Sequence, residues 1–214
     1  MKTGITLFTL FLLYMPLYSQ HNAESKAIMD KAFAGFETSQ GIQLSFKTIT
    51  TDAGGSVYQP QSGIAFIKGN RFKLEMETME IWFDGETQWV YIDETNEVNI
   101  SKPEGQEIAA VSPLALLGMY KSGYLLKAPV STTVNGTPVW RIEMTPATGN
   151  RDFKVVTASI NKKNHTVVQV TLTAANGMKT QINITQYNAN HRFDDARFRF
   201  NKTEHPDAEI IDLR

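Results

Sequence analysis

The sequence contains no cysteine among its 214 residues. That absence excludes disulfides, thiolate metal sites, thiol nucleophiles and a lipid anchor attached to a cysteine. The chain also lacks a strong charge of either sign, because 21 lysine and arginine residues face 22 aspartate and glutamate residues, for a formal net charge of -1. A chain without a basic field gives no reason to expect nucleic acid as a partner.

Motifs of catalysis and of metal binding are missing as well. The four histidines have no metal-ligand spacing, and three of them stand beside turn residues. No glycine-rich phosphate loop and no nucleophile elbow occurs. We therefore expect no metal site, no cofactor and no enzymatic activity. An enzyme of lipid metabolism would need a nucleophile and a base that the sequence does not present together.

Long apolar runs are scarce, and the longest extends from Ile5 to Leu17, just after Lys2. It is short for a membrane span but has the length of a signal peptide. We predict that residues 1–19 are a signal peptide cleaved before Gln20, with Ser19 as the small residue at the site. An N-terminal membrane anchor is the alternative. Residues 20–214 are then expected to form one soluble domain outside the cytoplasm.

What the sequence has in abundance is alternation of apolar and polar residues with a period of two, most clearly over residues 72–98. Phe72, Leu74 and Met76 alternate with charged residues in the first of three such runs. Side chains on a strand point to opposite faces in turn, so this pattern predicts strands with one apolar and one solvated face. Asp84-Gly85 between two runs is a hairpin signal.

The same pattern repeats along most of the chain and gives about ten strands at hairpin spacing. An antiparallel sheet of that size has to curl. The predicted fold class is mainly β (α+β): a curved antiparallel half-barrel of about ten strands, with helices covering its concave apolar face. Phe198 and Phe200 are expected to close the strand pattern.

Two segments are expected to be helices. Residues 22–38 carry an apolar stripe at helical spacing, made of Ile28, Met29, Ala32, Phe33 and Phe36. The second helix, 113–121, begins with Ser112 as N-cap and Pro113 at the first helical position. It is apolar almost all round, so it must be buried or lie against something apolar. We expect it to be a movable lid over the concave face.

Taken together, these segments resemble the LolA-type outer-membrane lipoprotein carriers of the bacterial periplasm. The resemblance runs over nearly the whole mature chain and depends on the order and spacing of several short motifs. These are the strand led by Gly63 with Phe66 and Lys68, the run from Phe72 to Met76, Asp84-Gly85-x-Thr87-x-Trp89-x-Tyr91 followed by Glu97-Val98, Ser112-Pro113-Leu114-x-Leu116-Leu117, and Phe198-x-Phe200 followed by Pro206 and Glu209-Ile210-Ile211-Asp212.

The resemblance implies a periplasmic carrier that shields the acyl chains of lipoproteins and moves them from the inner to the outer membrane. The implied partners are acylated lipoproteins, an inner-membrane ABC-type lipoprotein-releasing transporter and an outer-membrane acceptor, and a monomer is expected. The lipid-binding cavity is expected to be lined by Phe46, Phe66, Phe72, Leu74, Met76, Ile81, Phe83, Trp89, Tyr91, Trp140, Ile142, Met144, Val170 and Leu172. The expected lid residues are Ile28, Met29, Phe33, Phe36, Leu114, Leu117 and Met119.

The sequence departs from the family at one position. Many members carry Lys-Arg-Pro after the second strand, and that arginine helps to hold the lid closed. Here the run is Lys68-Gly69-Asn70-Arg71, which puts Gly69 in the arginine's place. Either Arg71 substitutes for it, or apolar contact alone holds the lid.

Three alternatives stay open at the level of sequence. A carrier of free lipid or glycolipid, or a lipid-sensing domain of the same fold, would present the same apolar wall. The methionines of the pattern would adapt to chains of varied shape, but they would equally fill a dry core.

Strand parity places Trp140 and Trp89 inward and Trp82 outward, and a slip of one residue would reverse each assignment.

Overall fold

The computed structural model describes residues 18–103, 113–121, 123–148 and 152–214. Most of the expected signal peptide therefore lies outside the described residues. The first helix, α1 (Tyr18–Glu37), begins at Tyr18, so the expected cleavage site before Gln20 falls within its first turn. None of the described helices is both long and apolar enough to cross a membrane.

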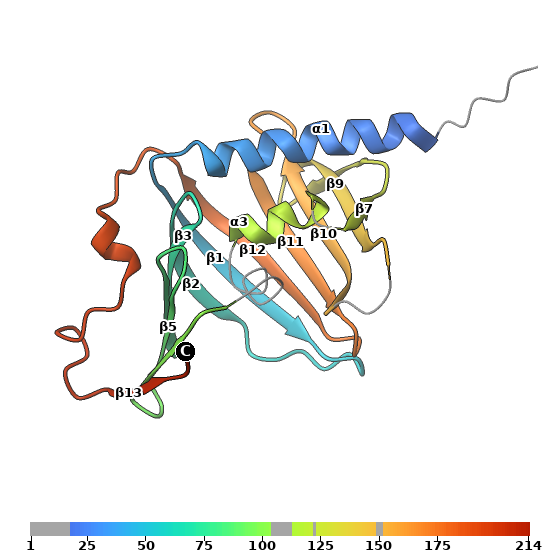
Figure 1. Cartoon of the computed structure of the whole chain (residues 1–214). Coiled ribbons are helices and arrows are strands. Elements are labelled where there is room, and N and C mark those ends of the chain that lie inside the picture. Colours follow the sequence, from blue (N-terminus) through green and yellow to red (C-terminus); the bar gives the residue numbers. More distant parts are fainter. Residues whose placement is uncertain (1–17, 104–112, 122, 149–151) are drawn as a thin grey trace, which may run out of the picture.

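One open, curled sheet of 13 strands forms the body of the molecule (Figure 1). The strands follow the order β13-β6-β5-β4-β3-β2-β1-β12-β11-β10-β9-β7, and β8 also pairs with β9. Their bounds are β1 (Ile42–Thr51), β2 (Gln61–Lys68), β3 (Arg71–Met76), β4 (Met79–Phe83), β5 (Gln88–Ile92), β6 (Glu97–Ser101), β7 (Tyr124–Leu126), β8 (Val130–Val134), β9 (Thr137–Pro146), β10 (Phe153–Asn161), β11 (Val167–Ala174), β12 (Lys179–Asn188) and β13 (Glu209–Asp212).

The central strand of this sheet is β1, which joins two antiparallel meanders. On one side it pairs with β2, and the meander continues through β3, β4, β5 and β6. On the other side it pairs with β12 and, through it, with β11, β10 and β9. A register shift between Ser45 and Phe46 marks an irregularity in the pairing of β1 with β12, a feature that bends a strand. The fold is mainly β and the sheet is mainly antiparallel, as expected. The strands β13 and β6 pair in parallel.

Both expected helices lie over the concave face. Along α1 the buried residues Ile28, Met29, Ala32 and Phe36 face the sheet. The second helix is shorter than expected, because α3 (Pro113–Gly118) gives way to the 3-10 turn η1 (Met119–Lys121). Figure 1 shows α1 crossing the end of the curled sheet and α3 lying beneath it, inside the curve.

The convex face of the β2–β6 half is covered by a segment that we call the strap, residues 189–208. Figure 1 shows it descending on the side of these strands that is away from α3. It contains the 3-10 turn η2 (Asp195–Phe198), whose Phe198 is fully buried, and then leads into β13. The strand expected at Phe198 and Phe200 is therefore wrong. These rings cover the sheet from outside, which also satisfies an apolar pattern.

Candidate functional site

The concave face holds an apolar cavity of about 220 Å³ beneath the two helices. Its lining comes from both meanders and from both helices, and consists of Phe36, Leu44, Phe46, Thr48, Ala65, Leu74, Met76, Ile81, Leu116, Leu117, Val167, Val170, Ile182 and Ile184. Phe46, one of the lining residues, lies against Gly63 on β2. A side chain there would place its Cβ 2.6 Å from the Phe46 ring, so glycine lets that ring lie against the sheet.

The chemistry of this lining is uniform. Among the described residues, Thr48 is its single polar side chain, and no acid, base or amide lines the space. Cavities lined by leucine, isoleucine and phenylalanine stay dry and accept apolar guests, as an engineered cavity of ~150 Å³ does with benzene. The cavity is thus suited to hydrocarbon, and the side chains described around it offer no group for proton transfer or for metal binding.

The structure divides the expected cavity residues into three groups. Phe46, Leu74, Met76, Ile81 and Val170 line the cavity, as do Phe36 and Leu117 of the expected lid. A second group belongs to the same core cluster without lining the space, namely Phe72, Phe83, Trp140, Ile142, Met144 and Leu172 of the cavity list and Ile28, Met29, Phe33 and Met119 of the lid list. The side chain of Leu114 lies outside the described residues.

The third group is a correction, because Phe66, Trp89 and Tyr91 lie on the opposite face. Trp89 and Tyr91 pack against Val98, Ile100 and Ala208 in a separate cluster, and the Phe66 ring meets Phe193 of the strap at 5.6 Å. The reason is the strap. It buries the outer face of these strands, so both faces are apolar and alternation no longer tells inside from outside.

Trp82 and Trp140 have the expected orientations. Trp140 packs against the core cluster, with the Lys162 amine 3.9 Å from its ring. Trp82 points to the convex side, but it is only 1% exposed, because Phe200 and His205 of the strap cover it.

Several lining residues were not expected as cavity residues, although some have a readable signal. Leu44 stands two positions before Phe46, and Ile182 and Ile184 alternate with polar neighbours on β12. Strand parity and pairing with β1 would have included all three. Thr48 and Ala65 carry no such signal, because a small residue beside a space looks like any other small residue.

Polar contacts hold the two helices together over the cavity. The Tyr120 hydroxyl donates to Asp30 Oδ1 at 2.5 Å, and the Lys26 amine pairs with Asp30 Oδ2 at 2.7 Å. The Lys121 amine lies 3.4 Å from the centroid of the Phe33 ring, a close cation–π contact. At Gly118, a Cβ would come within 3.0 Å of the same ring, so α3 approaches α1 closely there. We call the Asp30–Tyr120 and Phe33–Lys121 contacts the latch.

The latch shifts the titration of its members. The hydrogen bonds from Lys26 and then from Tyr120 hold the pKa of Asp30 below its ordinary value. Burial, and then the bond to Asp30, raise the pKa of Tyr120 well above its usual range. Asp30 is therefore ionised and Tyr120 protonated at neutral pH, which are the states that make the hydrogen bond.

Arg71 does not reach the lid. Its guanidinium pairs with Asp195 of the strap at 2.6 Å, and Lys68 pairs with the same carboxylate at 2.7 Å. The hydrogen bonds from Lys68 and then from Arg71 lower the pKa of Asp195 to about 2. Arg71 thus fastens the strap to β3 on the convex side, whereas the latch lies between the helices on the concave side.

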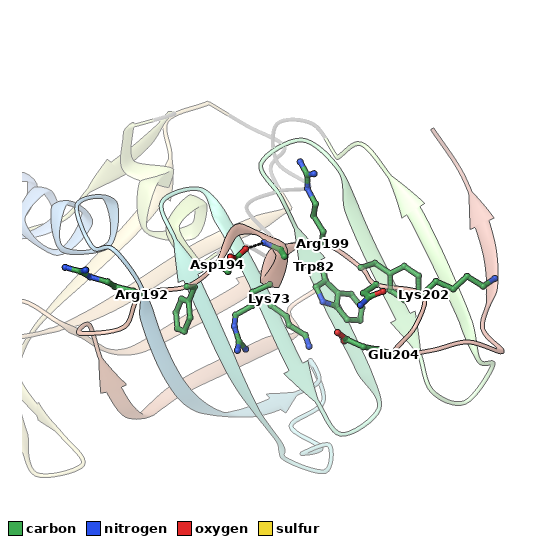
Figure 2. A pocket seen from close by; sticks show the side chains of 12 residues that line it. Lys73, Trp82, Arg192, Asp194, Arg199, Lys202 and Glu204 are labelled. Carbon is green, nitrogen blue, oxygen red and sulfur yellow. Dashed lines mark hydrogen bonds between the residues drawn. The ribbon is translucent and has the colours of Figure 1, made fainter.

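A larger hollow of about 600 Å³ lies on the convex side, between the strap and the sheet (Figure 2). It is lined by cations, carboxylates and aromatic rings, with Lys73 and Trp82 among them. Lys73 is already paired with Glu75 and Glu80, each at 2.9 Å. Figure 2 shows Arg192, Arg199 and Lys202 pointing in different directions. The positive groups do not converge, so this hollow is less suited to a ligand than the apolar cavity.

Comparison with known proteins adds a family and a fold. Residues 15–177 match the family model described as outer membrane lipoprotein carrier protein LolA. No curated protein matches the sequence at a significant level.

Among solved structures, an uncharacterized conserved protein from Thermus thermophilus is 12% identical with a TM-score of 0.58, covering 88% of this chain and 99% of that one. A putative outer membrane lipoprotein-sorting protein domain from Vibrio parahaemolyticus is 11% identical with a TM-score of 0.49, covering 86% and 99%. The Mycobacterium tuberculosis lipoprotein LppX is 15% identical with a TM-score of 0.49, covering 81% and 100%. At these identities the likeness concerns the fold alone.

Proposed function

The chain belongs to the family of LolA outer membrane lipoprotein carrier proteins, and from this premise we propose that it shields the acyl chains of lipoproteins and carries them between membranes. The observation that carries the proposal is the apolar cavity of about 220 Å³ under two helices that are joined by polar contacts. An acyl chain gains ~0.8 kcal/mol for each methylene that leaves water. A dry apolar space is the environment that offers this gain.

Release requires that binding is not too strong. A long chain that is fully enclosed would gain on the order of 10 kcal/mol. Phe36, Leu116 and Leu117 occupy part of the concave face when the helices are closed, so incoming chains must displace them. This competition lowers the net affinity. The space of about 220 Å³ is of the same order as the engineered cavity of ~150 Å³ that accepts one benzene, so a long chain needs more room and loading includes movement of the lid.

We also propose the location and partners of the protein, which we infer from its membership of the family. The chain would be exported with cleavage before Gln20, act in the periplasm as a monomer, receive lipoproteins from an inner-membrane ABC-type transporter and deliver them to an outer-membrane acceptor. It would act as a carrier and not as an enzyme.

Cavity binding is tested with a matched pair of neighbours on β1. Thr48 lines the cavity, whereas Lys47 is exposed on the opposite face. We expect Thr48→Phe to fill the space and to weaken binding of a fluorescent fatty-acyl probe by roughly tenfold, the equivalent of two methylenes. Lys47→Phe should bind as the wild type does. Equal affinities for all three proteins would contradict the proposal.

The cargo is identified by mass spectrometry of what co-purifies with the full-length protein from the periplasm of its own host. We expect acylated lipoproteins, and less of them with Thr48→Phe. Free phospholipid or glycolipid in their place, in a comparable molar amount, would instead make the protein a carrier of free lipid.

A further inference from the structure

Exposed apolar side chains gather where the β1–β2 loop meets the β11–β12 turn. Val57 is 63% exposed, Tyr58 55% and Met178 37%. The loop and the turn touch, because a Cβ on Gly177 would lie 3.1 Å from the Cβ of Ala53. Both project at the lower right of Figure 1, away from α1. We call Val57, Tyr58 and Met178 the tip patch.

The tip patch continues the strand pair that lines the cavity. On β1 and β12, Thr48 pairs with Ile182, and both line the cavity. The next pair on the same face is Thr50 with Thr180, whose hydroxyl oxygens are 3.2 Å apart. Beyond this pair, the Tyr58 amide donates to the Thr50 carbonyl at 2.8 Å, and Met178 precedes Thr180 by two residues. The concave face therefore leads from the cavity to Tyr58 and Met178 without a change of strands, whereas Val57 pairs with Thr51 and lies on the other face of the same tip.

The patch is held outward by an ordered loop. One oxygen of Asp52 accepts from the amides of Gly54 and Ser56 at 2.8 and 2.9 Å, and the Asp52 amide donates to the Ser56 carbonyl at 2.9 Å. The Asp52 carboxylate is thus satisfied by the backbone of its own loop. A fixed loop that keeps Val57 and Tyr58 in water, beside the exposed Met178 of the adjoining turn, presents a contact surface.

We propose that the tip patch inserts shallowly into the surface of a lipid bilayer, and that acyl chains enter and leave the cavity along β1 and β12. This inference builds on the proposed function. A valine, a tyrosine and a methionine on two adjoining hairpin tips suit the interfacial zone, where a tyrosine ring lies with its hydroxyl near water. A protein partner of ordinary affinity would need ~800 Å² on each side, more than three side chains on a tip provide. Lys179 is exposed beside Met178, where its amine can reach lipid headgroups.

The absence of cysteine permits a direct test by single-cysteine labelling. Tyr58→Cys carries an environment-sensitive bimane label at the patch. Leu213→Cys carries it at a residue that is 65% exposed beyond β13, at an edge of the sheet and far in strand order from β1 and β12. With phosphatidylcholine vesicles, the emission of the Tyr58→Cys label should shift to the blue and that of the Leu213→Cys label should not. No shift at Tyr58→Cys, or equal shifts at both sites, overturns the inference.

A second measurement does not depend on a label. Replacing the three patch residues together by serine should weaken sedimentation with these vesicles by roughly tenfold, because most of the inserted apolar surface is lost. Serine at Ile210 and Leu213 removes comparable exposed surface elsewhere and should change nothing. The fatty-acyl probe separates the two hypotheses. If it binds the wild type and vesicle contact is absent or unaffected by the patch variant, the inference fails and the carrier proposal stands. If the probe does not bind, the carrier proposal fails.

Discussion

At the scale of single residues, the Asp30–Tyr120 hydrogen bond of the latch is the contact that we expect to control opening of the cavity. The hydrogen bond of 2.5 Å joins α1 to η1, two elements that the Phe33–Lys121 cation–π contact also joins. In the lid movement that we propose, opening breaks this bond. Weakening it should therefore move the balance toward the open, loadable state.

We expect Tyr120→Phe to lower the free energy of unfolding by about 1 kcal/mol, the usual net value of one hydrogen bond. The same loss in the closed state should raise the affinity for the fatty-acyl probe by up to about fivefold. Urea unfolding and probe titration measure the two effects. Tyr91→Phe removes a hydroxyl on the convex side and should leave the affinity unchanged. A Tyr120→Phe protein with wild-type affinity and stability would show that the Asp30–Tyr120 hydrogen bond does not stabilise the closed state.

The pH dependence of this latch follows from Asp30. The pKa of Asp30 is lowered in the folded protein, so its contribution to stability is present above the ordinary value of ~3.9 and is lost as the pH falls through the lowered value. The stability difference between wild type and Tyr120→Phe should accordingly be full at pH 7 and shrink below pH ~4. A difference that grows on acidification would contradict this assignment.

At the scale of elements, the short helix α3 differs from the strands beneath it. It has six residues, is followed directly by a 3-10 turn, and is tied down through Tyr120 and Lys121 at its end. Strand β11, in contrast, is hydrogen-bonded on both edges, to β10 and β12. Isolated helices of this length are unstable alone, so α3 depends on its packing.

Hydrogen exchange should therefore find the amides of α3 less protected than those of β11 in the empty protein, and should find their protection changed by the fatty-acyl probe. The amides of β11 act as the internal control in the same experiment. Equal protection of both elements, with no response to the probe, would mean that α3 is a fixed part of the core.

The strap is an element of a different kind, because it contributes stability on the face that is away from the cavity. Phe198 is fully buried, and removing such a ring usually costs ~3–5 kcal/mol. We expect Phe198→Ala to lower the free energy of unfolding by about this amount while the remaining folded protein binds the fatty-acyl probe with wild-type affinity. A large loss of affinity at unchanged stability would place the strap in the binding mechanism.

The strap also explains why strand alternation predicts the inward and outward faces of some strands and not of others. Alternation correctly predicted the curled antiparallel sheet and the faces of Trp140 and Trp82, because one side of those strands is visibly more polar. Helical spacing and the Ser112-Pro113 start correctly predicted the two helices. It failed at Trp89, whose strand also carries Val90 and Ile92 on the other face. The register with β4, which pairs Trp82 with Trp89, decides the question. That pairing, and the covering of the outer face by residues far along the chain, are tertiary facts that a local pattern does not contain.

The size of the cavity could likewise not be predicted from the alternation of apolar and polar residues. Met76 lines the space whereas Met144 is fully buried in the packed part of the same face, although both belong to alternating strands. The parity of a strand tells which face a residue occupies. Whether that face is hollow depends on how the helices and the two meanders fit together.

At the scale of the whole molecule, the two faces of the sheet are covered by different elements. The concave face combines a packed region near β9 and β10 with the hollow near β1, β11 and β12, closed by α1 and α3. The convex face of the other meander is sealed by the strap. We propose that an acyl chain occupies the apolar cavity and no other part of the molecule.

Quenching by a brominated fatty acid tests this claim most directly, because bromine quenches indole fluorescence only at close contact. In a protein whose three tryptophans are replaced by phenylalanine, Phe46→Trp exchanges one aromatic ring for an indole at the cavity wall. A companion protein keeps Trp82 alone, on the convex side and 1% exposed. We predict strong, saturable quenching of the Phe46→Trp protein and none of the Trp82 protein. Quenching of Trp82 with none at Phe46→Trp would place the ligand on the wrong face and contradict the account.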